Sequence, residues 1–192
     1  MKKKQVLALA VIALCCAILA SATVAYFVDR DTARNVITSG GVDITIVEQR
    51  LTDNGLEEYP AEPIQIMPGT TASKIVSIRS EQNDAYIRAS FTVTVLDAAG
   101  VPMELTAEQT AALVRMDTNT ADWTERDGWW YYGKAVSDGD MTQPLFREVT
   151  FDGPSMTNEY QNCTVQIDVT AQSVQQANNG ASALEAAGWP EA

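Results

Sequence analysis

The sequence contains no histidine among its 192 residues. This absence excludes a zinc-protease helix of the H-E-x-x-H type and any zinc site that uses a histidine ligand. A serine or cysteine nucleophile would also lack an imidazole to serve as its base. The common hydrolase classes are therefore disfavoured, and we expect that the protein is not an enzyme.

Two close acidic pairs leave an all-carboxylate metal site open, because carboxylate oxygens alone can ligate calcium. The pairs are Asp29 with Asp31 and Asp138 with Asp140. Neither pair resembles the twelve-residue calcium loop of an EF-hand. Solvated acidic turns are the simpler interpretation, so we expect no metal and no other cofactor.

Cysteine is also scarce, with Cys15, Cys16 and Cys163 as the only three. The first two lie in an apolar leader, so a processed chain keeps Cys163 alone and has no intrachain disulfide. Leu14 precedes Cys15 where a lipoprotein signal needs a small residue, which disfavours a lipid-modified terminus. Cys163 falls on the apolar face of an alternating segment, and we expect a buried, inert thiol.

Basic residues are few, with 13 Lys and Arg against 25 Asp and Glu and a net charge of −12. Three of the basic residues occupy positions 2–4, and every acidic residue follows position 25. Residues 26–192 therefore carry 10 basic and 25 acidic side chains, a net charge of −15. Nucleic acids and anionic membrane surfaces are poor partners for such a chain.

The amino-terminal segment has the layout of a secretory signal peptide. Three lysines precede the uninterrupted apolar run 6–20, and small residues follow. The small-residue rule allows cleavage after Ala22, or after Ala25 with Thr23 at the −3 position and Tyr26 as the new first residue. We expect residues 1–25 to be removed on export. The alternative is an uncleaved anchor, since residues 6–28 carry no charge and are long enough to span a bilayer.

Strict alternation of apolar and polar residues marks two strong strands, at 85–95 and 163–171. Weaker strand patterns occur at 42–48, 74–79, 128–134 and 145–151, separated by turn residues. Many short strands of this kind predict an all-β fold, an antiparallel β-sandwich.

One or two short helices are expected in the connections between strands. Thr106 and Gln109 form the pattern of a capping box in front of an apolar stretch at 111–116. A second short helix is predicted at 182–187, ending at Gly188 before Pro190.

Several motifs carry a resemblance to the TasA/CalY (camelysin) family. The run "AYFVDRDTARNVITSGGVDITI" resembles the start of its mature proteins, where a special signal peptidase cuts before an A-[AYF]-F-x-D element followed by N-x-F-x-[AS]-G-x-[LV]-D-[LI]. The matching residues are Tyr26, Phe27, Asp29, Asn35, Ile37, Ser39, Gly40, Val42, Asp43 and Ile44. "IMPGTTASKIVSIRSEQNDAYIRASFTV" resembles a later family segment, with Gln82-Asn83-Asp84 in place of its Asn-x-Gly turn. Together with "DGWWYYGKAVSDGDMTQPLF" and "NEYQNCTVQIDVTAQSVQQANN", the resemblance spans nearly the whole chain.

The resemblance implies an exported, jelly-roll-like sandwich at 40–192 that polymerises into biofilm matrix fibres. In that picture residues 26–39 form a donor strand that completes a sheet of the neighbouring subunit. The candidate pocket-filling residues are Tyr26, Phe27, Val28, Val36 and Ile37. The alternative is that this segment forms a first strand of its own domain.

The resemblance also implies partners and a location. The expected partners are further copies of the chain, a signal peptidase and an accessory anchoring or seeding protein, with membrane contact only through the leader. The expected location is the extracellular matrix or cell surface of a Gram-positive bacterium.

Two other functions compete with fibre assembly. The first is a cell-surface glycan- or protein-binding module, an adhesin held by an uncleaved leader, with "WWYY" at 129–132 as a sugar-stacking platform. The simpler interpretation of that segment is a strand that buries alternate aromatic side chains in the sandwich. The second is the metallo-endopeptidase activity attached to the camelysin name, which the absence of histidine opposes.

Overall fold

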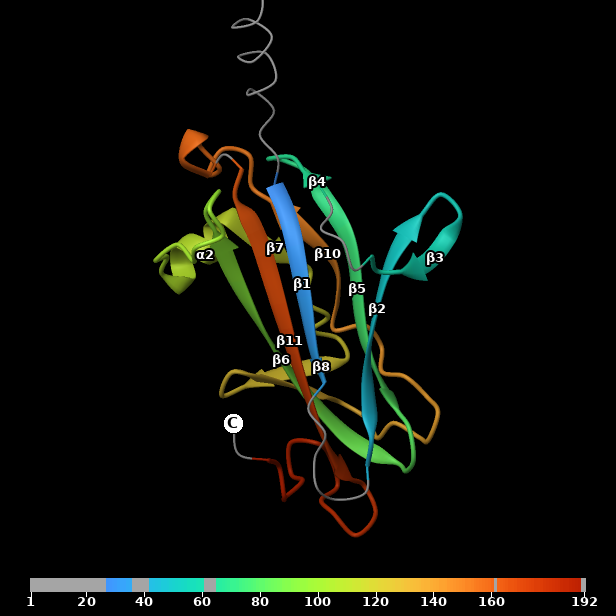
Figure 1. Cartoon of the computed structure of the whole chain (residues 1–192). Coiled ribbons are helices and arrows are strands. Elements are labelled where there is room, and N and C mark those ends of the chain that lie inside the picture. Colours follow the sequence, from blue (N-terminus) through green and yellow to red (C-terminus); the bar gives the residue numbers. More distant parts are fainter. Residues whose placement is uncertain (1–26, 36–41, 61–64, 161, 191–192) are drawn as a thin grey trace, which may run out of the picture.

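Two β-sheets pack face to face and form an all-β sandwich, as the sequence predicts (Figure 1). The computed structural model describes residues 27–35, 42–60, 65–160 and 162–190, with the backbone alone for 27–35 and 65–66. Within these residues no helix is long and apolar enough to cross a membrane. The jelly-roll connectivity implied by the family resemblance stays a prediction.

The first sheet has the strand order β4-β1-β11-β6-β9-β8. Its ladders are antiparallel except for the pair β1–β11, which is parallel. The strands are β1 (Phe27–Asn35), β4 (Gln65–Ile66), β6 (Ala85–Leu96), β8 (Trp123–Arg126), β9 (Trp129–Tyr132) and β11 (Thr164–Gln175).

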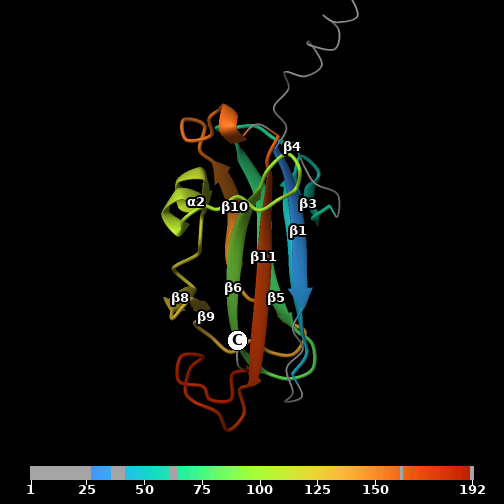
Figure 2. The same ribbon diagram turned by 60° about the vertical axis from the view of Figure 1, so that its left-hand side comes forward.

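The second sheet has the order β3-β2-β5-β10-β7 and is antiparallel throughout. Figure 2 shows this sheet behind the first one, with the strands of both sheets aligned along roughly the same axis. Its strands are β2 (Ile44–Thr52), β3 (Gly55–Glu58), β5 (Thr71–Ser80), β7 (Val114–Met116) and β10 (Phe146–Phe151).

The two strongly alternating segments pair with each other as β6 and β11. Their register runs without a break from Thr164 opposite Leu96 to Gln175 opposite Ala85. Since side chains alternate across a strand, one face of this ladder is apolar and turns inward. Its buried residues include Ile87, Ala89, Val165, Ile167 and Val169.

The second sheet supplies the other half of the core. Val76 and Ile78 of β5 and the β10 residues Phe146, Val149 and Phe151 are buried against the first sheet. The side of β5 that turns inward also carries a charged residue, Lys74, which is fully buried.

The central helix forms where the sequence predicts it but ends earlier. Helix α2 (Ala107–Leu113) begins with the expected capping box, in which the Gln109 N–H donates to Thr106 Oγ1 (3.2 Å) and the Thr106 N–H donates to Gln109 Oε1 (2.8 Å). The expected continuation through 116 is wrong, because Val114–Met116 is extended and pairs with β10 as β7. Tertiary pairing here outweighs a helical propensity that differs little among these residues.

The second predicted helix, at 182–187, is also wrong. The N–H groups of Glu185 and Ala186 both donate to the Ser182 carbonyl (3.1 and 3.0 Å), which makes a single turn that does not continue. Six residues are too few to hold a helix without strong packing of one face. Instead Ala183 is buried beside Tyr86 on the outer face of the first sheet. A short 3₁₀ helix, η1 (Asn158–Tyr160), lies elsewhere, before β11.

The inward face of β11 gives a direct test of the sandwich. We expect Ile167→Ala to lower the free energy of unfolding by about 2–5 kcal/mol, because it leaves a cavity in the core. Thr170→Ala, on the outward face of the same strand, is the control and should cost less than about 1 kcal/mol. Urea denaturation monitored by circular dichroism measures both values, and equal losses would contradict the assignment of faces.

Candidate functional site

Strand β1 lies beside β11 near the edge of the first sheet, with only the two-residue strand β4 outside it. Its backbone runs parallel to β11 in a continuous register from Val28 opposite Thr164 to Asn35 opposite Ala171 (Figures 1 and 2). On its other side it pairs with β4 through Phe27 and Val28 only. Within the described residues, no strand pairs with the rest of β1 on that side.

Of the expected donor residues, Phe27 and Val28 therefore lie in a strand that pairs within its own chain. Tyr26, Val36 and Ile37 lie outside the described residues, as do the cleavage-site residues Thr23 and Ala25. The backbone arrangement is that of the alternative in which the segment completes its own domain. In this arrangement the segment pairs along the edge of β11.

The pair β1–β11 brings together the first and the last of the described strands. Neighbouring antiparallel strands are commonly held by a short hairpin, whereas parallel strands need a long connection. Here all the other described strands of the sandwich lie between Asn35 and Thr164 in sequence. The described contact of β1 with β11 is the backbone ladder, with no turn linking the two strands.

A group of charged and polar side chains lies on the inward side of the second sheet, near the level of β1. The buried Lys74 Nζ lies 3.4 Å from Glu48 Oε2 and 3.8 Å from the centre of the Tyr59 ring. Arg50, two residues beyond Glu48 on the same side of β2, donates to Glu57 Oε2 (3.1 Å). Sequence reasoning missed this group, although the period of Val76 and Ile78 extends back to Lys74 and could have indicated it.

The segment "WWYY" forms β9, with its side chains divided between the two faces of the sheet. The register sets Trp130 beside the inward-facing Ala89, and Trp130 and Tyr132 pack against the core. Trp129 and Tyr131 lie on the outer face. The segment is thus a strand, as expected, and its inward side chains are the buried Tyr132 and the partly buried Trp130.

On that outer face, Arg88 binds the aromatic residues and the C-terminal segment together. Its guanidinium carbon lies 4.3 Å from the centre of the Trp129 ring and 4.8 Å from that of Trp189. One of the two faces of the Trp129 ring is therefore occupied by the cation and closed to a stacking sugar.

Hydrogen bonds complete the surroundings of Arg88, which is itself buried. Its guanidinium donates to Gln172 Oε1 (2.8 and 2.6 Å), Tyr131 Oη (3.1 Å) and the Pro190 carbonyl (2.9 Å). Four charge-assisted contacts hold a guanidinium strongly in a buried setting. The chain after β11 is thereby fastened to the outer face of the first sheet.

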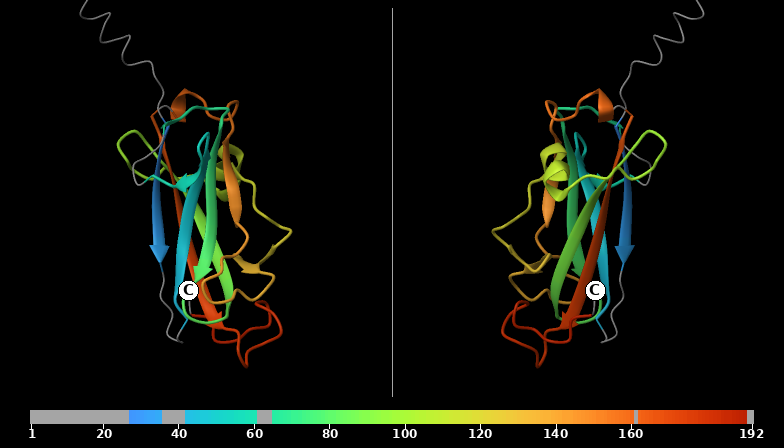
Figure 3. Two further views of the ribbon diagram at one scale, coloured as in Figure 1. Left: turned by 90° about the vertical axis from the view of Figure 1, so that its right-hand side faces the viewer. Right: turned by 90° about the vertical axis from the view of Figure 1, so that its left-hand side faces the viewer.

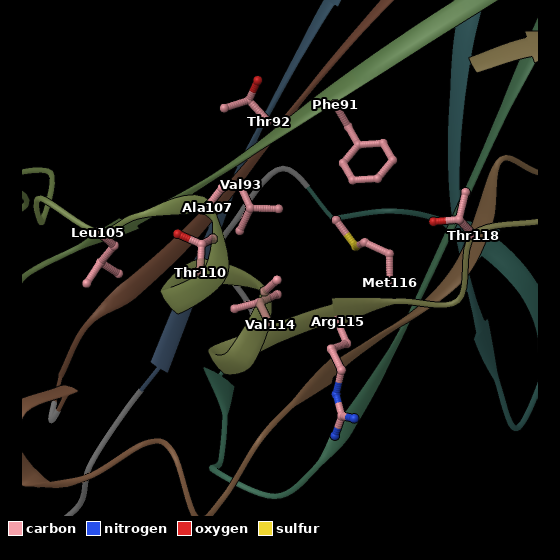
Figure 4. A pocket seen from close by; sticks show the side chains of 11 residues that line it. Phe91, Thr92, Val93, Leu105, Ala107, Thr110, Val114, Arg115, Met116 and Thr118 are labelled. Carbon is pink, nitrogen blue, oxygen red and sulfur yellow. The ribbon is translucent and has the colours of Figure 1, made fainter. Parts of the chain in front are cut away.

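An open groove lies between β6 and β7 beside α2, with a volume of about 650 Å³. Figure 4 shows Phe91 of β6 and Met116 of β7 pointing toward each other, while the Arg115 guanidinium points away. The edge of β6 is open here, because β9 pairs with β6 only at Arg88 and Ala89 and no described strand pairs with residues 90–94 on that side. No sequence pattern indicated this groove separately, since its residues also fit ordinary core positions.

The acidic pairs show no metal geometry among the described side chains. Asp138 and Asp140 flank Gly139 in an exposed turn, and no group of three or more His, Cys, Asp or Glu residues comes together in the described part of the chain. Asp29 and Asp31 lie in β1, where the backbone alone is described.

Cys163 is buried, as the sequence predicts, with its Sγ 3.7 Å from Met103 Sδ. Burial raises the pKa of the thiol, and the negative charges of Asp97 and Glu159 add to the effect. Because the thiolate is the reactive form, a raised pKa makes this thiol a poor nucleophile.

The contacts of Arg88 predict how the C-terminal segment is held. We expect Arg88→Met to lower the free energy of unfolding by about 2 kcal/mol or more and to speed amide exchange in residues 176–190, because several charge-assisted hydrogen bonds are lost. Arg79→Met is the matched control, since Arg79 is half-buried and its guanidinium contacts Met141 Sδ (3.7 Å). Hydrogen exchange measured by mass spectrometry would contradict the assignment if residues 176–190 exchanged at the wild-type rate in Arg88→Met.

No model of a known protein family matches the chain, and a search of curated proteins finds none with significant similarity. The resemblance to the TasA/CalY family therefore rests on the sequence motifs, and the function it implies is a proposal.

Proposed function

We propose that the protein is a secreted, non-enzymatic structural protein that assembles into extracellular matrix fibres by donor-strand exchange. The observation that supports this proposal is the place of β1. The strand nearest the amino terminus fills the edge of β11 through a parallel ladder that no hairpin closes.

Backbone pairing makes exchange between copies physically reasonable. Without β1, the N–H and C=O groups along one edge of β11 would lie open, and an open edge is a template for another strand. The same segment of a second copy offers the same backbone groups and the same side chains as the chain's own β1. Because the contact is made between two different surfaces, repeated exchange produces an open chain of subunits unless the ring closes.

Cleavage of the leader would control this exchange. Phe27, the first residue of β1, follows directly after Tyr26, the first residue left by the cut at Ala25. An uncleaved apolar leader would hold the strand at the membrane, whereas a signal peptidase would release it. Other copies of the chain, and an accessory anchoring or seeding protein, are then the proposed partners at a Gram-positive cell surface or in its matrix.

The charge of the mature chain affects assembly as well. A net charge of −15 on residues 26–192 keeps separate copies soluble and apart. Salt screens this repulsion over about 8–10 Å at physiological strength. Fibres should therefore form more readily as ionic strength rises toward physiological values.

A disulfide between β1 and β11 distinguishes exchange from pairing within one chain. Positions 32 and 168 are backbone partners, and neighbouring strands lie about 4.8 Å apart, within the range that a disulfide can bridge. We expect Thr32→Cys with Asp168→Cys, in a Cys163→Ala background, to give covalent multimers when the assembled mature chain is oxidised. A non-reducing denaturing gel reads the result.

Each single-cysteine variant, and a chain that lacks residues 26–35, serves as a control and should give no ladder of multimers. Mass spectrometry of the exported chain verifies that it begins at Tyr26. Oxidation that closes only covalent monomers would contradict donor-strand exchange and favour a first strand that stays in its own domain.

A second candidate function is a cell-surface module that binds a partner protein, and the groove beside α2 is the observation that favours it. The groove has a largely apolar lining and borders the open edge of β6. An extended peptide could pair with such an edge and place its side chains in the groove. In this function the leader stays as an anchor and β1 stays in its own sheet. The occupied face of Trp129 makes a glycan a weaker choice of ligand.

Peptide display tests this second function. Selection against the mature chain should return apolar, strand-forming peptides, and Val93→Arg should abolish their binding because it places a charge in the groove lining. Leu56→Arg, at an exposed apolar position on β3, is the control and should leave binding intact. Peptides that bind both variants equally would exclude the groove as their site.

A further inference from the structure

The register of β1 against β11 places the acidic and the basic positions of β1 on opposite faces of the sheet. Asp29 and Asp31 pair with Val165 and Ile167, which belong to the buried face of β11. Partners in neighbouring strands lie on the same face of a sheet, so both acidic positions belong to the inward face. The basic positions of β1, Arg30 and Arg34, pair instead with Gln166 and Thr170 on the outward face.

The inward face at this level meets the charged group of the second sheet. Ser173 Oγ of β11 donates to the Val42 carbonyl just before β2 (3.3 Å), which fixes the two strands at one point. In Figures 1 and 3, β11 and β2 run in opposite directions. Val165 lies eight residues before Ser173 in β11, and Arg50 lies eight residues after Val42 in β2. Since all strands rise by a similar distance per residue, the partner of Val165 in β1, Asp29, is level with Arg50.

Lys74 lies at the same level. The Leu51 N–H donates to Ser73 Oγ (2.8 Å), which continues the β2–β5 register and sets Arg50 beside Lys74. Lys74 is fully buried, and Arg50 Nε is a buried donor without a hydrogen-bond partner among the described residues. Both cations therefore lie on the side that the acidic positions of β1 share, with Lys74 fully buried beside Glu48, and Arg50, whose side chain is 38% exposed, beside Glu57.

Carboxylates on the inward face of a sandwich need positive partners, because an isolated buried charge is very unfavourable. We propose that Lys74 and Arg50 select for acidic residues at positions 29 and 31, and that this recognition selects the strand and the register that fill the edge of β11. The occupant is an acidic strand with carboxylates at alternate positions, supplied by the chain itself or by a second copy. The second case rests on the proposed function.

Charge also excludes the wrong registers. A slip of one residue turns every side chain of a strand to the other face. Arg30 would then lie inward, level with Lys74 and Arg50, and like charges at short range repel. Arg34 would turn toward the apolar level of Ile44 and Ile46, where a charge is unfavourable. The alternation of acidic and basic residues in "DRDTAR" thus opposes a slipped strand as well as stabilising the correct one.

A double-mutant cycle tests the recognition, with amide exchange in β1 as its readout. We expect Asp29→Asn with Asp31→Asn, and separately Lys74→Met, each to reduce the protection of residues 27–35 by about tenfold or more. When the three substitutions are combined, the change should be much smaller than the product of the two, because the groups act on each other. Asp168→Asn, on the outward face of β11, is the control and should have little effect.

The cycle separates this inference from the proposed function. Independent effects in the cycle, or an Asp29 and Asp31 pair that behaves like Asp168→Asn, would overturn the recognition even if fibres form. Coupled effects in a chain that stays monomeric would support the recognition within one chain and count against assembly. The buried Lys74→Met variant keeps the side-chain volume, and native circular dichroism and protection of β5 and β10 verify that it folds.

Discussion

The pairing of β6 with β11 is the interaction on which the rest of this sandwich depends. These two long strands are hydrogen-bonded over their whole lengths and carry the strongest alternation in the sequence. Their inward side chains fix the core, and their two outer edges decide where every other strand of the first sheet can lie. One edge accepts β1, and the other accepts β9 along only part of its length, which leaves the groove beside α2.

The two faces of the β6–β11 ladder have different roles. Inward, aliphatic residues such as Ile87 and Ile167 are buried against β5 and β10. Outward, Arg88 and Gln172 lie side by side and hold the chain that follows β11, through contacts with Trp189 and Pro190. A single period-two pattern therefore specifies both the hydrophobic core and the attachment of the C-terminal segment.

Much of this fold could be predicted from local pattern, because a half-buried strand shows its burial directly in its sequence. The strands β2, β5, β6, β9, β10 and β11 all overlap segments that alternate. The short strands β3, β4, β7 and β8 could not be found in this way, since two to four residues carry too little periodicity and are specified by their partners. Val114 illustrates the point, because it continues the apolar stretch that follows the capping box, and its pairing with Phe151 places it in a strand.

The candidate site was less predictable than the fold for a related reason. The motif around Phe27 indicated a strand with a special role, but its neighbour β11 is distant in sequence, and nothing local specifies a parallel pair. Lys74 and Arg88 were missed because a charged residue in an alternating strand is normally taken as solvent-facing. The period of Val76 and Ile78 already places Lys74 on the inward face, whereas only the three-dimensional contacts show that Arg88 is enclosed by aromatic side chains.

The parallel direction of β1 also has a mechanical consequence. Eight register pairs join β1 to β11 along one line. If this contact links subunits in a filament, tension along the strands loads all of its hydrogen bonds in shear at the same time. A hairpin pulled apart at its open end breaks its bonds one after another and yields at a lower force. A filament joined through β1 would therefore resist stretching far better than peeling, which is the property required of a fibre that holds cells together.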